Sequence, residues 1–126
     1  MGMLRILLID DDKRILKAYG RFLSYANLVT TASSCDEALK IIRDTPERAE
    51  VIVSDFCMPG MSSTEFFGNI RKMCAAPLII ITGFASHPEL ESLRNDGIHV
   101  LEKPVRLNLL QQLIQQAALA SSLPTP

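Results

Sequence analysis

The stretch Val51–Gly60, which reads VIVSDFCMPG, decides the fold because it carries a short apolar run directly into a carboxylate and then into a turn. Its first three residues are β-branched, which suits a fully buried strand, and Pro59 and Gly60 end regular structure soon afterwards. Asp55 therefore lies at the carboxyl end of a strand. Ligands of open α/β sheets bind at that edge, so Asp55 is a candidate functional group, although an Asp at this position can equally cap the following turn.

The composition predicts a single soluble domain. The chain has 126 residues, of which 48% are hydrophobic, and this is enough for one core. A net charge of -1 without any basic run gives no support for nucleic-acid binding. The apolar runs are far shorter than a membrane span, and no signal peptide precedes them. We therefore expect a cytoplasmic protein that contacts neither a membrane nor nucleic acid.

The three cysteines favour neither a disulfide framework nor a zinc site. Cys35, Cys57 and Cys74 are odd in number, far apart and outside any C-x-x-C pattern. We expect reduced thiols.

Short apolar strands alternate with amphipathic helices along the rest of the chain. The first three predicted helices follow a capping residue, and the fourth begins with a proline at its first helical position. The predicted helices carry apolar residues at helical spacing, and the predicted strands are almost free of charge. Strands are expected at Leu4–Ile9, Val29–Ala32, Val51–Asp55, Leu78–Thr82 and His99–Leu101, and helices after Asp12, Ser34, Ser62 and His87 and over Leu107–Ala120.

This alternation is typical of an α/β protein with parallel strands that are covered on both faces. Right-handed crossovers bring all the carboxyl ends of the strands to one edge of the sheet. Five side chains are expected to gather there, namely Asp10, Asp11, Asp55, Thr82 and Lys103.

Several carboxylates at one edge indicate a divalent metal, because they repel one another and raise one another's pKa unless a cation neutralises them. Magnesium prefers oxygen ligands and usually takes one or two carboxylates, which suits Asp11 and Asp55 with help from Asp10 and a loop carbonyl.

A carboxylate can also act as a nucleophile toward phosphorus and form an aspartyl phosphate. Such chemistry needs charge neutralisation more than acid or base groups, and Lys103 and a metal supply it. The hydroxyl of Thr82 can donate a hydrogen bond to a phosphoryl oxygen. The simpler alternatives are that Lys103 only pairs with the acids and that Thr82 merely suits a strand.

Four pieces of sequence form one pattern: the acidic pair Asp10-Asp11, Asp55 followed by Met58-Pro59-Gly60, the pair Ile81-Thr82, and Lys103-Pro104. Together they resemble the receiver domain of two-component response regulators. The resemblance implies a flavodoxin-like, doubly wound (βα)5 fold with a five-stranded parallel sheet in the order 2-1-3-4-5. It assigns residues 1–120 to the receiver domain and leaves 121–126 as a flexible tail or the start of a linker.

The same resemblance implies a role for each residue of the site. Asp55 would be the phosphoacceptor, Thr82 the switch hydroxyl and Lys103 the contact to the phosphoryl group. Mg²⁺ would be held by Asp10, Asp11, Asp55 and the backbone carbonyl of Cys57. Such a domain is a regulatory phosphoacceptor rather than an enzyme, capable at most of self-phosphorylation and autodephosphorylation.

The resemblance also implies partners. A phosphohistidine on a sensor histidine kinase would be the donor, and a downstream output domain or protein would contact the surface of the fourth helix, fifth strand and fifth helix. Uncharged residues on the last helix form either a homodimer or partner face or a solvated polar face; these are Gln111, Gln112, Gln115 and Gln116.

Some positions depart from the usual receiver pattern. Val100 stands three residues before Lys103, where receivers usually carry Tyr or Phe, and Gly97 lies one residue closer to Lys103 than usual. Gly83 replaces the more usual Ala, and Phe84 offers a nearby ring. These departures concern switching and not phosphorylation.

Two other functional classes compete with the receiver. A phosphatase of the haloacid dehalogenase type needs an acid two residues after its nucleophile, and this chain has Cys57 there. A pseudo-receiver, which keeps the fold and acts as an interaction module without phosphate, is the stronger alternative. Val100 and the shortened loop before the last strand favour it, whereas the presence of all five site residues argues against it. Dinucleotide binding is excluded, since no G-x-G-x-x-G follows the first strand.

Overall fold

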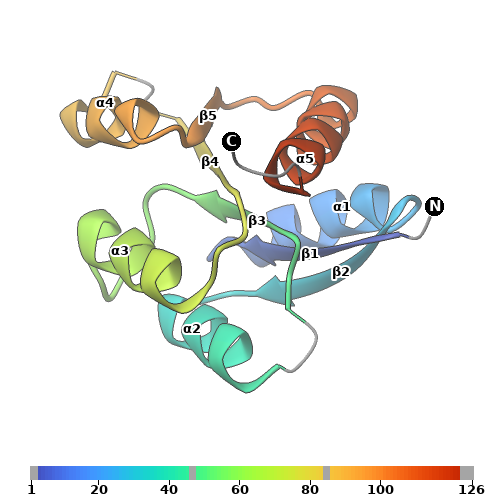
Figure 1. The fold of residues 1–126 in the computed structure, drawn as a ribbon, viewed down its shortest axis with the longest axis horizontal. Helices are drawn as coiled ribbons and strands as arrows, with labels where there is room; N and C mark the ends of the chain where they lie inside the picture. Colours follow the sequence, from blue (N-terminus) through green and yellow to red (C-terminus); the bar gives the residue numbers. More distant parts are fainter. Residues whose placement is uncertain (1–2, 46–47, 84–85, 123–126) are drawn as a thin grey trace.

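The computed structural model describes residues 3–45, 48–83 and 86–122, and strands and helices alternate along them (Figure 1). The strands are β1 Leu4–Ile9, β2 Asn27–Ala32, β3 Val51–Asp55, β4 Leu78–Thr82 and β5 His99–Glu102. The helices are α1 Lys13–Leu23, α2 Cys35–Asp44, α3 Ser63–Met73, α4 Pro88–Asn95 and α5 Leu107–Ser122. None of these helices is both long and apolar enough to cross a bilayer.

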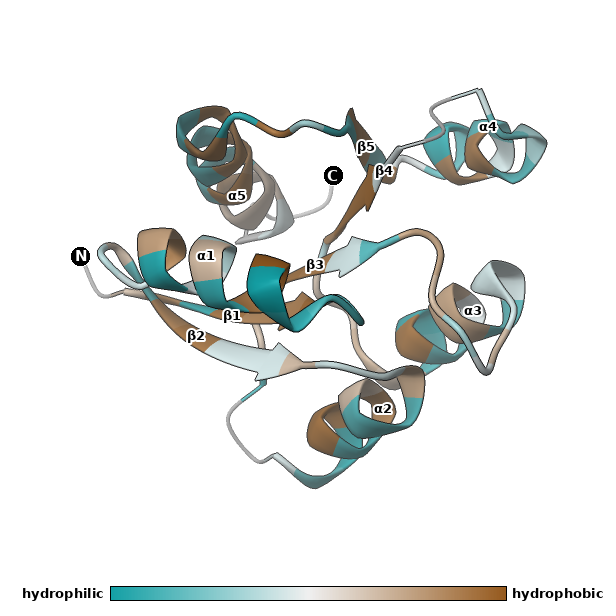
Figure 2. Cartoon of the chain, turned by 180° about the vertical axis from the view of Figure 1, so that it is seen from behind, coloured by the Kyte–Doolittle hydropathy of each residue, from teal (hydrophilic) through white to brown (hydrophobic). Residues whose placement is uncertain are grey.

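The strands form one parallel five-stranded sheet in the order β2-β1-β3-β4-β5, which confirms the predicted flavodoxin-like topology. Alternate residues of β1 point to opposite faces, so that Leu7 and Ile9 pack under α2, α3 and α4 while Ile6 and Leu8 pack under α1 and α5. Figures 1 and 2 show α1 and α5 on one side of the sheet and α2 and α3 on the other. Both faces are therefore buried, which explains why the central strands are apolar throughout.

The helices begin where the capping residues predict. The side chains of Asp12, Ser34 and Ser62 accept hydrogen bonds from backbone N–H groups in the first turns of α1, α2 and α3. His87 caps α4, because its Nδ1 accepts the N–H of Glu89 at 3.2 Å. The four capping residues therefore set where the loops that follow β1, β2, β3 and β4 end and the next helices begin.

Three element ends differ by one or two residues from the prediction. β2 begins at Asn27, β5 ends at Glu102, and α5 continues to Ser122. β2 starts early because its backbone pairs with β1 from Asn27, which lies opposite Leu4. The buried side-chain amide of Asn27 also donates to the carbonyl of Leu23 at 2.9 Å and to Oε1 of Gln111 at 2.6 Å. Long-range contacts of this kind leave no local mark in the sequence.

The predicted polar face of α5 needs a correction at Gln111. Its Oε1 accepts the bond from Asn27 and its Nε2 atom is buried, so Gln111 belongs to the packed side of the helix. Gln112, Gln115 and Gln116 are exposed, as predicted. Phe84 and residues 123–126, which are part of the sequence-based expectations, lie outside the described residues.

Candidate functional site

The sheet brings the predicted residues to one edge. Asp10 directly follows β1, Asp55 ends β3 and Thr82 ends β4, while Lys103 directly follows β5. The strand register sets these ends side by side, since Asp55 lies opposite Ile81, the residue before Thr82. The backbone N–H of Lys103 donates to the carbonyl of Thr82 at 2.8 Å, which ties the last strand to the site.

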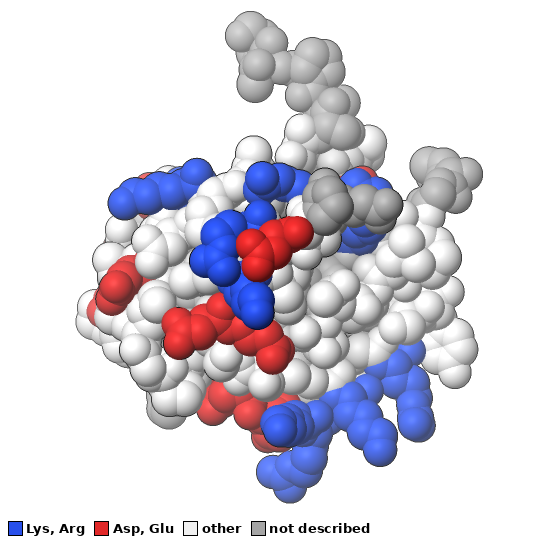
Figure 3. Space-filling view, turned by 90° about the horizontal axis from the view of Figure 1, so that it is seen from below, with Lys and Arg blue, Asp and Glu red and all other residues white. Residues whose placement is uncertain are grey.

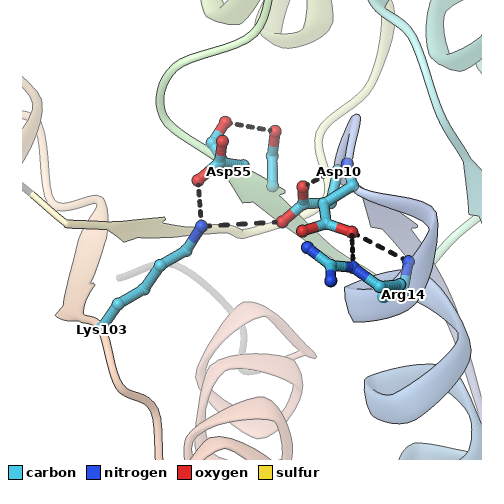
Figure 4. Close-up of polar contacts among 6 residues, drawn as sticks. Asp10, Arg14, Asp55 and Lys103 are labelled. Carbon is cyan, nitrogen blue, oxygen red and sulfur yellow. Dashed lines mark hydrogen bonds and ion pairs between the residues drawn. The ribbon is translucent and has the colours of Figure 1, made fainter.

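Lys103 lies between two buried carboxylates (Figure 4). Its Nζ is 3.0 Å from Oδ1 of Asp55 and 3.8 Å from Oδ2 of Asp10. Carboxylate oxygens of Asp10, Asp11 and Asp55 lie within 4.8 Å of one another. Three acids and one base therefore share one small volume, and the carboxylates outnumber the cation.

Burial and crowding disfavour the charged form of both inner acids. Burial raises the pKa of Asp10 to about 6; the bond from the Asp12 N–H lowers it, and the charge of Asp55 adds to the rise. The pKa of Asp55 is also raised, mainly by burial, although the hydrogen bond and charge of Lys103 oppose that rise. Burial lowers the pKa of Lys103, but Asp55 and Asp10 more than offset it, so this pKa is raised and the amine stays charged.

These shifts predict that Asp10→Asn stabilises the metal-free fold. The pKa of Asp10 rises on folding from 3.8 to about 6, so the folded state holds its proton more tightly. The cost of ionising it is absent below about pH 4 and fully present above about pH 6. Since one pKa unit corresponds to about 1.4 kcal/mol, we expect the variant to gain about 3 kcal/mol at pH 7 and little at pH 4. Urea unfolding in EDTA at both pH values measures this, with Glu91→Gln on α4 as the control; an equal gain at both pH values would contradict an origin in the ionisation of Asp10.

The neighbouring acids play unequal parts. Asp11 is exposed, whereas Asp10 is buried, so a cation could reach the cluster from solvent on the Asp11 side. Asp12 faces away into the first turn of α1, where its carboxylate accepts the N–H of Arg14 at 2.9 Å. Asp12 is thus a capping residue, as the sequence indicates.

The loop after Asp55 is held by contacts that the sequence does not reveal. The N–H of Phe56 donates to the carbonyl of Ile81 at 2.9 Å, and the hydroxyl of Ser63 donates to the carbonyl of Phe56 at 2.8 Å. The ring of Phe56 also meets His87 edge-on, with centroids 5.1 Å apart. Cys57 follows and is exposed. Because Phe56, the residue before it, is bonded to both β4 and α3, the backbone of Cys57 belongs to an anchored loop.

The donor set fits a hard divalent cation. Carboxylate oxygens are the ligands that such ions prefer, and the excess negative charge is what a cation would relieve. The raised pKa of Asp10 means that protons compete with a metal below about pH 6. The site could therefore bind a metal such as Mg²⁺.

Comparisons with known proteins agree with this geometry. The family model for the response regulator receiver domain matches residues 6–115. A solved response regulator receiver domain protein from Clostridium thermocellum is 31% identical, with a TM-score of 0.82 over 94% of this chain and 96% of that one. A CheY-like receiver from Methanospirillum hungatei is 26% identical, with a TM-score of 0.84 over 95% of this chain and 97% of that one.

The chain therefore belongs to the response regulator receiver domain family. Among curated relatives, it is 34% identical over 115 residues to the transcriptional regulatory protein GlrR of Escherichia coli (strain K12), and 32% identical over 133 residues to the virulence sensor protein BvgS of Bordetella pertussis. These matches cover 89% and 98% of this chain but only 26% of GlrR and 11% of BvgS. The chain thus spans only a small part of the length of these relatives.

Proposed function

We propose that this chain is a phosphorylation-activated signalling receiver, which takes a phosphoryl group from a sensor histidine kinase onto Asp55 in a Mg²⁺-dependent reaction. The observation that carries the proposal is the 3.0 Å contact between Lys103 and Asp55 inside the cluster of three carboxylates. A cation so placed neutralises charge on an incoming phosphoryl group, which is the main requirement of phosphoryl transfer.

Asp55 supplies the nucleophile. Its carboxylate oxygen forms a bond to phosphorus as the bond from phosphorus to the donor histidine nitrogen breaks, and the electron pair of that bond returns to the imidazole. When bound, Mg²⁺ neutralises charge on the phosphoryl oxygens. Asp10, Asp11, Asp55 and the backbone carbonyl of Cys57 would hold this ion. This is regulatory phosphoacceptor chemistry rather than turnover of a free substrate.

Lys103 and Thr82 couple the modification to the rest of the fold. A phosphoryl group adds about -1.5 to -2 charges at neutral pH and strong acceptor oxygens. Lys103 donates to these oxygens through its ammonium group and Thr82 through its hydroxyl. Because Thr82 ends β4 and Lys103 follows β5, their movement shifts the surface of α4, β5 and α5. That surface is read by a downstream output domain or protein, or by a second copy of the chain.

The proposal extends to the organisation of the protein. We assign residues 1–120 to the receiver unit and residues 121–126 to a tail or the start of a linker, although α5 itself continues to Ser122. Both the kinase contact and the output contact take place in the cytoplasm. The kinship with GlrR and with BvgS supports partners of the two-component type.

Intact mass spectrometry after incubation with acetyl phosphate tests the proposed reaction. With Mg²⁺, the native chain should gain one phosphate-sized adduct, and the adduct should be absent when EDTA replaces Mg²⁺. Beryllofluoride with Mg²⁺ should then shift the NMR signals of Thr82 and Lys103 and of the surface of α4 and β5. If neither adduct nor shift is observed, the chain is a phosphate-independent interaction module, the alternative favoured by Val100 in place of an aromatic residue.

A further inference from the structure

The edge of the sheet formed by β2 lacks the features that usually prevent strand addition. β2 is the edge strand and, within the described residues, pairs only with β1. Its sequence NLVTTA contains no charged residue and no proline, and Leu28 is 55% exposed. Natural proteins usually protect such edges with charges, prolines or bulges, because free backbone groups recruit another strand. β2 therefore presents a template for strand addition.

The direction of its backbone groups identifies the residues that would pair. The carbonyl of Ala32 accepts the N–H of Asp10 at 3.1 Å and so points toward β1. Backbone groups of a strand in a parallel pair point to alternate sides, so Thr30 and Leu28 share the direction of Ala32. The N–H and C=O groups of Val29 and Thr31 consequently point outward.

A basic stripe runs along α1 beside this edge. The helix sequence KRILKAYGRFL has basic residues and no acidic ones, and Lys13, Lys17 and Arg21 are all exposed. Within the described residues these three have no ion pair, whereas Arg14 lies 3.5 Å from Asp12. Figure 3 shows basic side chains gathered over α1 at the lower right of the view. The net charge of -1 thus conceals one strongly basic helix.

A groove separates the stripe from the edge strand. It measures about 660 Å³ and is lined by Lys13, Lys17 and Arg21 on the helix and by Val29 and Thr31 on β2. Gly20 also lines the groove, and a Cβ added there would lie 3.7 Å from Thr31 Cγ2, an ordinary van der Waals contact.

One acid, Glu37, also lines the groove. Its carboxylate accepts the N–H of Ser33 at 2.9 Å, so it is engaged at the start of α2. The long wall of the groove that α1 forms is left positive.

The spacing of the stripe matches an extended chain. Residues four apart on a helix are about 6 Å apart along its axis. Residues two apart on a strand are about 6.6 Å apart and share one face. Acids at alternate positions of an added strand would therefore meet Lys13, Lys17 and Arg21 in turn.

The other face of the added strand would meet a mainly apolar surface. Leu28 and Thr30 face the opposite side of the sheet, where they line a second hollow with Ile41 and Ile42 of α2. Arg5 and Arg48 also line this hollow, and Arg5 is paired with Glu50 at 3.6 Å. Residues between the acids would lie on this side, so a segment that alternates acidic and apolar residues satisfies both faces.

We propose that this receiver binds an acidic, extended segment of a partner protein, which adds to β2 as a sixth strand and pairs its alternate acids with the basic stripe of α1. The segment gains backbone hydrogen bonds from Val29 and Thr31 and specificity from the charges. The site is separate from the carboxylate cluster and does not depend on phosphorylation.

A peptide of alternating Glu and Val residues tests the proposal, with a peptide of the same composition whose Glu residues are contiguous as its comparison. Fluorescence anisotropy in low salt, without Mg²⁺ or a phosphodonor, should show tighter binding of the alternating peptide. Lys17→Glu replaces attraction by repulsion and should weaken it about tenfold, while Lys72→Glu on α3 should leave it unchanged.

Amide hydrogen exchange separates strand addition from simple charge attraction. The N–H groups of Val29 and Thr31 should become protected when the alternating peptide binds. Equal affinity for both peptides, binding without this protection, or no binding would each overturn the proposal. Protection of Val29 and Thr31 before any peptide is added, together with a doubled molecular mass in solution, would overturn it by assigning the edge to a second copy of the chain.

Discussion

Asp55→Asn is expected to abolish the uptake of a phosphoryl group from acetyl phosphate while leaving the fold intact. The amide replaces the nucleophilic carboxylate with a group of nearly the same shape that does not attack phosphorus. No other acid at the site is a substitute, because only the Asp55 carboxylate lies 3.0 Å from Lys103. Intact mass after incubation with Mg²⁺ should show the unmodified chain only.

The fold of this variant should hold because burial disfavours the native carboxylate. Burial raises the pKa of Asp55, so removing the ionised form removes a desolvation cost as well as the attraction to Lys103. The thermal midpoint in EDTA should therefore not fall appreciably. Asp36→Asn, an exposed acid in the first turn of α2, serves as the matched control and should accept phosphate as the native chain does. Retention of a full adduct by Asp55→Asn would refute the assignment of the phosphoacceptor.

Lys103→Met is expected to slow phosphorylation by about a hundredfold, which is the usual effect of losing one group that stabilises transition-state charge. Methionine keeps much of the length and apolar stem of the side chain but removes the ammonium group between Asp55 and Asp10. The backbone bond from residue 103 to the carbonyl of Thr82 is independent of the side chain and should persist. The rate constant for adduct formation by acetyl phosphate measures the effect.

Mg²⁺ affinity distinguishes this explanation from general damage to the site. Lys103 competes with a metal for the same carboxylates, so Lys103→Met should bind Mg²⁺ at least as tightly as the native chain. Lys72→Met on α3 should change neither quantity. A Lys103→Met variant that loses Mg²⁺ binding and phosphorylation together would show that the lysine acts by holding the cluster in place.

Much of this fold can be predicted from short, local stretches of the sequence. Capping residues such as Asp12, Ser34 and Ser62 mark helix starts, and uninterrupted apolar runs mark strands that are buried on both faces. Once strands and helices alternate, the handedness of the crossovers sends every carboxyl end to one edge. For this reason the sequence alone predicts that the residues of the candidate site lie together.

What the sequence could not provide depends on tertiary contacts. The bond between Asn27 and Gln111 joins residues 84 positions apart, and it places one glutamine on the packed side of α5. The pKa shifts in the acidic cluster likewise depend on burial, which differs between Asp10 and Asp11. Neither quantity follows from residue type alone.

The basic stripe of α1 is a different case, because its signal was present in the sequence. Neither the net charge nor a search for consecutive charges reveals it, since other residues separate Lys13, Lys17 and Arg21. Their spacing of four residues, once placed on a helix, produces one charged face. A basic surface of this kind is found by counting charges on each helix face rather than over the whole chain.

The central claim is that the Asp55 carboxylate carries the phosphoryl group, and reductive trapping tests it most directly. The native chain is incubated with acetyl phosphate and Mg²⁺, reduced with borohydride, digested and sequenced by mass spectrometry. Borohydride converts an aspartyl phosphate to homoserine, so homoserine should appear at position 55, and only in the presence of Mg²⁺. Homoserine at Asp10, Asp11 or another acid, or none at all in a chain that has gained a phosphate, would contradict the assignment.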